Sequence, residues 1–134
     1  PVQWSPDGSQ LAYVQRLMDP ANPPPVLVLA DGNGRNAAPY TSNAQLALYG
    51  WSPDGNHFLY AGSESAGIGQ VDVPPVKVEI AGGTAVMQWL NASTFITAAN
   101  VNGNWNLTST NLDGETTLLA SSKMPPPQFD VWSP

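Results

Sequence analysis

Short runs of apolar, aromatic and β-branched residues alternate with polar turns along the whole chain. Such runs are typical of β-strands, and no window repeats its apolar residues at helical spacing for long enough to predict a helix. The turns carry Pro, Asp, Asn and Gly, which preset backbone angles or supply a positive φ. The strands and turns fall into units with one plan of four antiparallel strands. The pattern therefore predicts an all-β protein built from repeats.

One marker opens each unit, a tryptophan followed by a tight turn. It is Trp4-Ser5-Pro6-Asp7-Gly8 in the first unit and Trp51-Ser52-Pro53-Asp54-Gly55 in the second. A degenerate copy with a shorter turn is Trp89-Leu90-Asn91-Ala92, and the last residues are Trp132-Ser133-Pro134. The tryptophans are 47, 38 and 43 residues apart, which is the spacing of a repeat array. We interpret the repeated positions as core spacers between units (Trp4, Trp51, Trp89 and Trp132) and as turn formers (Asp7, Gly8, Asp54 and Gly55).

The period of the marker predicts β-propeller blades, because four-stranded units of about 40–50 residues are typical of that fold. A β-sandwich also has regular short strands, but it gives no reason for one turn to return at this period. We predict three blades, over about 1–44, 45–84 and 85–127, and the first strand of a further blade over 128–134. The chain is therefore expected to be a fragment of a β-propeller.

The two intact copies of the marker, each followed by a strand such as Leu11-Ala12-Tyr13-Val14, resemble the WD-like repeats of TolB-type propellers. Similar repeats occur in the propeller domains of prolyl oligopeptidase-type serine peptidases. The turns Asp31-Gly32-Asn33-Gly34 and Leu112-Asp113-Gly114 also fit this resemblance. It implies a parent propeller of six or more blades and a location in the periplasm or outside the cell. A low lysine content is compatible with that location.

Charge and composition argue against several classes of function. Charged residues make up 10% of the chain, against roughly 25% in an ordinary globular domain. The net charge is −6, and four scattered cations give no basic stripe for nucleic acid or an anionic membrane. No apolar run is long enough for a transmembrane helix, so membrane insertion is not expected. The absence of cysteine excludes disulfides and thiolate metal sites.

The sequence carries no recognisable catalytic constellation. The only histidine, His57, follows a turn and is interpreted as a surface residue. Ser63-Glu64-Ser65-Ala66-Gly67 is close to a G-x-S-x-G nucleophile elbow, but it begins with Ser and precedes no helix, so we interpret it as a polar loop. Asp31 to Asn36 resembles the start of a calcium loop, but it has Arg35 where an acid is needed and lacks the closing Glu. We therefore expect no catalytic, cofactor-binding or metal-binding residues.

The connections of a propeller sort onto two faces, and the short turns after the first and third strands, including the one predicted at Pro74-Pro75 in the second unit, share one face. The longer connections share the other face, and we expect binding residues there because binding residues concentrate on variable loops. Trp105 has no aromatic counterpart in the other units and lies beside one of these connections, so it is the candidate contact with a partner. The predicted longer connections are Leu17 to Pro25, Pro39 to Ala44, Gly62 to Gly67, Ala81 to Thr84, Asn100 to Asn104 and Ser121 to Pro127.

Two functions remain open from the sequence. The first is a non-catalytic scaffold that binds a protein or another ligand. The second is the substrate-gating propeller of a prolyl oligopeptidase-type serine peptidase whose catalytic domain lies outside this chain. Terminal blades without caps expose apolar faces. The expected partners are therefore a protein, the remaining blades of a parent propeller, or a second copy of this chain that completes a ring.

Overall fold

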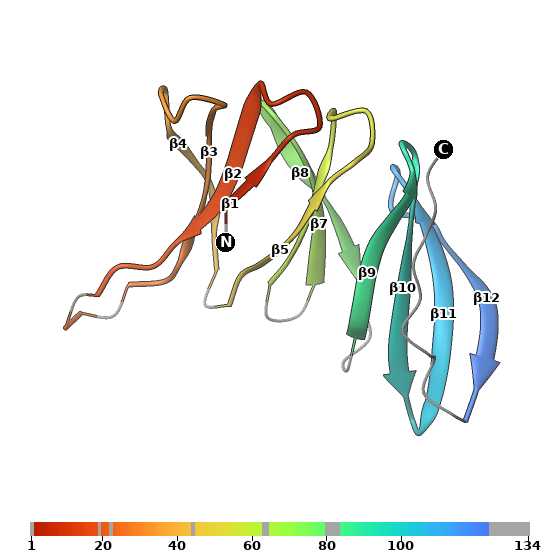
Figure 1. Cartoon of the computed structure of the whole chain (residues 1–134). Helices are drawn as coiled ribbons and strands as arrows, with labels where there is room; N and C mark the ends of the chain where they lie inside the picture. Colours follow the sequence, from red (N-terminus) through yellow and green to blue (C-terminus); the bar gives the residue numbers. More distant parts are fainter. Residues whose placement is uncertain are drawn as a thin grey trace.

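The computed structural model of the chain contains three four-stranded antiparallel sheets, which stand side by side in chain order (Figure 1). It describes residues 2–18, 20–21, 23–43, 45–62, 65–79 and 84–123, and no helix occurs among them. The arrangement is that of successive propeller blades, so the predicted fold class is confirmed. The strand predicted over 128–134, together with Trp132, lies outside the described residues.

Each sheet is formed by four strands that follow one another in the sequence. Sheet 1 contains β1 (Val2–Trp4), β2 (Gln10–Gln15), β3 (Val26–Asp31) and β4 (Ala38–Ser42). Sheet 2 contains β5 (Ala47–Trp51), β6 (Phe58–Ala61), β7 (Ser65–Gln70) and β8 (Val73–Glu79). Sheet 3 contains β9 (Thr84–Asn91), β10 (Thr94–Val101), β11 (Asn104–Asn111) and β12 (Thr116–Ser122).

The repeated marker forms the same hydrogen-bonded turn in sheets 1 and 2. In sheet 1 the Ser5 hydroxyl donates to the Asp7 carboxylate at 2.8 Å and accepts from the Gln10 N–H at 3.1 Å. The N–H of Gly8 donates to the Ser5 carbonyl at 2.9 Å, and its φ of 75° is one that glycine adopts at little cost. Sheet 2 repeats each of these bonds with its own residues, which are Ser52, Asp54, His57 and Gly55.

The third copy of the marker has a shorter turn, as the sequence predicts. β9 ends at Asn91 and β10 begins at Thr94, so only Ala92 and Ser93 connect the strands. The Asn91 side chain replaces the aspartate as hydrogen-bond acceptor in this turn. Its Oδ1 accepts from the Ser93 N–H at 2.9 Å and from the Ser93 hydroxyl at 3.0 Å. A different local solution thus joins the same pair of strands.

One predicted turn is misplaced in sheet 2. The sequence predicts the turn between the third and fourth strands at Pro74-Pro75, whereas the structure places it at Val71-Asp72, with Asp72 at a φ of 60°. Both prolines lie inside β8. β8 is an edge strand, and its register against β7 shifts between Ile68 and Gln70. An edge strand with a bulge tolerates residues that cannot donate a backbone hydrogen bond.

Several predicted long connections are shorter than expected. The connection predicted at Asn100 to Asn104 is a tight turn at Asn102-Gly103, whose φ angles of 54° and 84° are typical of a two-residue hairpin. Four other segments predicted as connections are partly β-strand. Of these, β4 extends to Ser42, β7 begins at Ser65, β9 begins at Thr84 and β12 extends to Ser122. The face with the longer connections is therefore less irregular than predicted.

Two apolar clusters join the three sheets. Successive side chains of a strand point to opposite faces, so Phe58 and Tyr60 on β6 pack toward sheet 1 while Leu59 packs toward sheet 3. The cluster between sheets 1 and 2 contains Ala12, Leu27, Leu29, Leu46, Phe58 and Tyr60. The cluster between sheets 2 and 3 contains Leu59, Ala66, Ile68, Val78, Met87, Trp89 and Phe95.

The repeated tryptophans differ in burial. Trp89 is buried between sheets 2 and 3, and Trp51 is half-buried against the cluster between sheets 1 and 2. Trp4 is 55% exposed, and its indole N–H donates to the Gly32 carbonyl of its own sheet at 2.9 Å. The burial expected of a spacer is therefore not found at Trp4, because no described sheet packs on that side of sheet 1.

Candidate functional site

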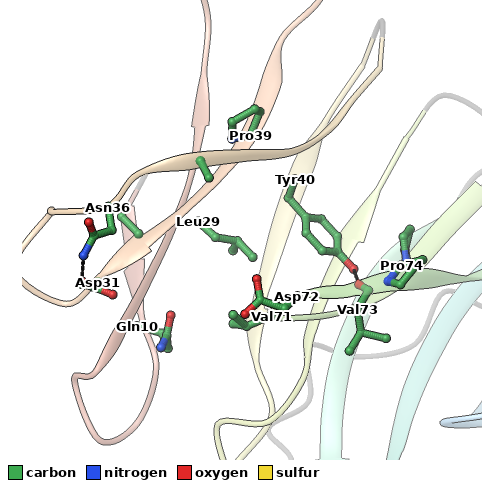
Figure 2. A pocket seen from close by; sticks show the side chains of 13 residues that line it. Gln10, Leu29, Asp31, Asn36, Pro39, Tyr40, Val71, Asp72, Val73 and Pro74 are labelled. Carbon is green, nitrogen blue, oxygen red and sulfur yellow. Dashed lines mark hydrogen bonds between the residues drawn. The ribbon is translucent and has the colours of Figure 1, made fainter.

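An open cleft of about 710 Å³ lies between sheet 1 and the outer hairpin of sheet 2 (Figure 2). Sheet 1 contributes β3, β4 and the turn between them, and sheet 2 contributes the turn from β7 into β8. Leu29, Pro39, Val71 and Pro74 give it apolar walls. The two sides come from different blades, so the cleft exists only where these sheets are packed together.

Tyr40 on β4 fastens the two sides of the cleft to each other. Its hydroxyl donates to the Val73 carbonyl at 2.7 Å and accepts from the Gln70 N–H at 3.3 Å. Its ring lies edge-on to Phe58, with the ring centroids 5.2 Å apart. Burial raises the pKa of the Tyr40 hydroxyl, so it remains protonated and able to donate at neutral pH. The hairpin of sheet 2 is thereby held in a fixed place beside sheet 1.

The polar lining of the cleft carries two carboxylates. Asp31 ends β3, and its Oδ2 accepts from the Asn36 side-chain amide at 2.6 Å. Asp72 occupies the positive-φ position of the turn on the other side. Figure 2 shows the side chains of Gln10, Asp31 and Asp72 around the opening. No Lys, Arg or His is among the residues that line the cleft, so its formal charge is negative.

The cleft lies on the face opposite the one predicted to bind. It is built by the connections after the third strands of sheets 1 and 2, which the sequence assigns to the short-turn face. The sequence gives a signal for each turn separately, in Asp31 and in the Val71 to Pro75 segment. It gives no signal that the two turns meet, because that depends on how one blade packs on the next.

The predicted contact residue Trp105 is not part of the cleft. It lies near the start of β11 in sheet 3, half-buried, paired with Asn100 on β10 and with Ser122 on β12. Its contact with a partner stays a prediction. The turn formers Asp7, Gly8, Asp54 and Gly55 lie in the marker turns and do not line the cleft either.

The structure places the residues considered for catalysis directly before β6 and within β7. His57 is half-buried rather than on the open surface, and its Nδ1 has no hydrogen-bond partner among the described residues. Ser65 and Gly67 belong to β7 rather than to the predicted polar loop, while positions 63 and 64 lie outside the described residues. A Cβ added at Gly67 would lie 2.2 Å from Cζ of Tyr60, so this glycine makes room for a ring. Its place in a strand is unlike a nucleophile elbow.

The segment that resembles a calcium loop is a turn, as predicted. The Asp31 N–H donates to the Arg35 carbonyl at 2.8 Å, and the Arg35 N–H donates to Oδ1 of Asn33 at 3.0 Å. Within the described residues, no three His, Cys, Asp or Glu side chains are grouped so that they could hold a metal ion. The part of the chain that the structure describes also has no helix able to cross a membrane.

The fold of the chain is similar to that of several known structures. Its sequence matches no protein-family model and no curated protein. The putative TolB from Agrobacterium tumefaciens is 19% identical and gives a TM-score of 0.69 over 90% of this chain and 46% of that one. The β-propeller domain of the Trilobed protease from Pyrococcus furiosus is 14% identical and gives a TM-score of 0.75 over 91% of this chain and 43% of that one.

These similarities concern the fold. The chain is similar to TolB and to the propeller domain of a protease, as the resemblance of its repeats implies. It spans less than half the length of either of those chains. The molecule is therefore part of a β-propeller, with a preformed acidic cleft between its first two blades.

Proposed function

Starting from a partial propeller with a cleft between two of its blades, we propose that this segment is a non-catalytic scaffold that binds a protein partner. The observation that carries the proposal is the cleft between sheets 1 and 2, whose two sides are joined by the hydrogen bonds of Tyr40. A preformed concave site costs little ordering when a ligand binds. No catalytic step is assigned to this segment.

The lining favours a partner segment that carries a lysine or an arginine. The aliphatic stem of such a side chain can lie on Leu29 and Val71, while its charged end reaches Asp31 or Asp72 at the rim. The net charge of −6 also raises the local concentration of a basic partner. An acidic segment would face like charges at the same rim, so the cleft discriminates by charge.

The test is a titration of the ¹⁵N-labelled chain with a blocked peptide, acetyl-Gly-Arg-Gly-amide, followed by NMR. We expect chemical-shift changes at the turn amides of Asp31 and Asp72, weaker at high salt. Asp72→Asn removes the charge but keeps a residue that accepts a positive φ. It should weaken binding about fivefold, the effect of losing about 1 kcal/mol from a surface ion pair.

Asp113→Asn is the matched control, because Asp113 lies in the corresponding turn of sheet 3 and does not line the cleft. This variant should bind the peptide as the unaltered chain does. The same peptide with citrulline in place of arginine should produce little shift. Equal binding of the citrulline peptide, or equal loss of affinity in both variants, would contradict the proposal.

A second candidate function is the gating propeller of a peptidase, and the similarity to the propeller domain of the Trilobed protease favours it. In that case a peptide passes the cleft on its way to a catalytic domain elsewhere in the parent protein. The parent reading frame distinguishes the two functions. A strand–G-x-S-x-G–helix segment followed by Asp and His supports the peptidase, whereas further Trp-Ser-Pro-Asp-Gly units with no such segment support the scaffold.

A further inference from the structure

The outer strands of the three sheets differ in how open their edges are. Within the part of the chain that the structure describes, β4, β8 and β12 each pair with a neighbour on one side only. Such an edge can add a strand of another chain, and proteins often prevent this with prolines or charged residues. β4 contains Pro39, and β8 contains Pro74 and Pro75 together with the ion pair of Lys77 and Glu79 at 3.4 Å. The first two outer edges are therefore protected.

β12 has neither kind of protection. Its sequence is Thr-Thr-Leu-Leu-Ala-Ser-Ser, without a proline or a charge, and every residue of the strand is exposed. Leu118 and Leu119 are 58% and 52% exposed, so two large apolar side chains lie on this edge. Figure 1 shows β12 (blue) at the open edge of sheet 3. Of the three outer strands, β12 is therefore the one best suited to pair with another chain.

The sequence of β12 and its flanks is complementary to itself in the antiparallel direction. Pairing of two copies about a two-fold axis at Leu119 places apolar residues opposite apolar ones, hydroxyl residues opposite hydroxyl ones and opposite charges opposite each other. The pairs are Leu119 with Leu119, Leu118 with Ala120, Thr117 with Ser121, Thr116 with Ser122, and Glu115 with Lys123. Threonine–serine pairs and pairs of opposite charge stabilise antiparallel strands when they lie directly opposite each other.

The charged pair at the ends of the pattern gives the register its direction. Glu115 lies directly before β12 and Lys123 directly after it, and both are exposed. The Glu115 Oε2 accepts from the Asn111 side-chain amide at 3.2 Å, so the second carboxylate oxygen can accept from a lysine of another chain. The same construction about the middle of β8 places Pro75 opposite Lys77, where proline cannot donate to the new strand. Self-complementarity is therefore a property of β12 and not of β8.

The bulge of β12 lies on the axis of this pairing. Ala120 pairs with Leu107 on β11 and Leu118 pairs with Thr108, so Leu119 is the extra residue. A bulge in one strand alone shifts the register of the pair. Two copies related by an axis at Leu119 have their bulges opposite each other, so the residues on both sides of the axis stay in register.

We infer that β12 is the interaction surface for a second copy of this chain, whose own β12 adds antiparallel to it and joins the two sheets into one. Both copies contribute the same residues, which is the arrangement of a two-fold symmetric dimer. The edge is separate from the cleft between sheets 1 and 2, and this dimer does not complete a propeller ring. A single strand pair makes an interface below about 1,200 Å², so we expect a dissociation constant of about 10–1000 µM.

The test is sedimentation equilibrium of the full chain at concentrations up to about 1 mM, with two charge-reversed variants. Glu115→Lys puts lysine at both ends of β12, and Lys123→Glu puts glutamate at both ends. Each variant alone should dimerise at least about fivefold more weakly, because like charges then lie opposite each other. An equimolar mixture should restore dimerisation, because the lysines of one chain face the glutamates of the other.

Leu119→Lys tests the position of the axis. It places two lysines opposite each other and should weaken dimerisation at least about tenfold. Val76→Lys on β8 is the matched control, since Val76 is also exposed and apolar, and it should leave dimerisation unchanged. Urea denaturation verifies that each variant is folded.

Three results overturn the inference. The first is an unaltered chain that stays monomeric up to the highest concentration. The second is a mixture of the charge-reversed variants that dimerises no better than either variant alone. The third is dimerisation that survives Leu119→Lys, which assigns the second copy to another surface, such as the apolar side of a terminal sheet.

Discussion

The two faces of sheet 2 meet their neighbours with different kinds of side chain. Toward sheet 1, the rings of Phe58 and Tyr60 lie over Gly69 and Gly67 of the paired strand. A Cβ added at Gly69 would lie 2.2 Å from Cζ of Phe58, so the ring fills the space that a side chain on β7 would need. Toward sheet 3, the residues of sheet 2 are aliphatic, namely Leu59, Ala66, Ile68 and Val78.

The difference explains how the cleft forms on the side of sheet 2 that faces sheet 1. Aromatic side chains combine a large apolar area with a polar tip. Tyr40 adds to the aromatic side a hydroxyl that reaches across to the outer hairpin of sheet 2. Tyr60 is buried on the same side, and that burial raises its pKa to about 12. The aliphatic residues toward sheet 3 have no polar atoms in their side chains, so they contribute apolar packing alone.

The largest expected effect comes from removing the central ring of the aromatic side. Phe58 is 0% exposed, and Phe58→Ala should lower the free energy of unfolding by about 3–5 kcal/mol through lost burial and a residual cavity. The variant should also weaken binding of the arginine peptide, because Tyr40 packs against the Phe58 ring. Urea denaturation and the peptide titration measure the two effects.

Leu59→Ala is the matched control on the aliphatic side, since Leu59 is also 0% exposed and lies next in the strand. It should cost about 2–5 kcal/mol of stability and leave peptide binding unchanged. Loss of peptide binding in a folded Leu59→Ala chain would show that the two faces of sheet 2 are not independent.

A smaller effect is expected from filling the space under the ring. Gly69→Ala should cost about 1–3 kcal/mol, because the new methyl group forces the Phe58 ring or the strand to move. Phe58→Leu should reduce that cost, since its smaller side chain leaves room for the methyl group. A double-mutant cycle measures the coupling. Simple additivity of the two changes would mean that the ring and the glycine do not constrain each other.

The sequence was sufficient for features that rest on neighbouring residues. The marker turns follow from Ser5, Asp7 and Gly8, whose hydrogen bonds all lie within the turn. The period of the marker predicted the three sheets, because each sheet is formed by four strands that follow one another in the sequence. The cleft was missed because Tyr40 and Val73 are 33 residues apart and meet only when two sheets pack. The turn at Pro74-Pro75 was misplaced because tolerance for proline depends on β8 being an edge strand.

The indole N–H groups of Trp51 and Trp89 each donate to a backbone carbonyl of the preceding sheet, and these two bonds should contribute unequally to stability. Trp89→Phe keeps an aromatic ring but leaves the Gly50 carbonyl without its donor, and should cost about 1–2 kcal/mol. Trp51→Phe should lower the free energy of unfolding by less, because Trp51 is half-buried. Water can then donate to the Gln3 carbonyl in place of the indole N–H. Trp4→Phe should change stability by no more than about 0.5 kcal/mol, as is usual for exposed positions. Urea denaturation of the three variants tests this order, and a cost for Trp4→Phe equal to that of Trp89→Phe would refute it.

The smallest expected effect is the loss of stability in acid. It should differ between the marker turns of sheets 1 and 2, which contain an aspartate, and the shorter turn of sheet 3, which contains Asn91. Hydrogen bonds from the Ser9 N–H, the Ser9 hydroxyl and the Ser5 hydroxyl lower the pKa of Asp7 to about 2. The Ser52 hydroxyl is the main cause of the lowered pKa of Asp54. A carboxyl whose pKa is lower in the folded chain stabilises the fold above its unfolded pKa of about 4 and loses that contribution as pH falls through its folded pKa.

The turn at Asp7 should therefore weaken between about pH 4 and pH 2, and the turn at Asp54 should weaken as pH falls below about 4, whereas Asn91 in sheet 3 cannot titrate. Carboxyl ¹³C NMR should give a midpoint near 2 for Asp7. Asp7→Asn should reduce the loss of stability in this pH range, because the amide oxygen still accepts from Ser9 but has no proton to gain. A midpoint of 3.8 for Asp7 would mean that its turn hydrogen bonds do not favour the carboxylate, and the contrast with the turn at Asn91 would be lost.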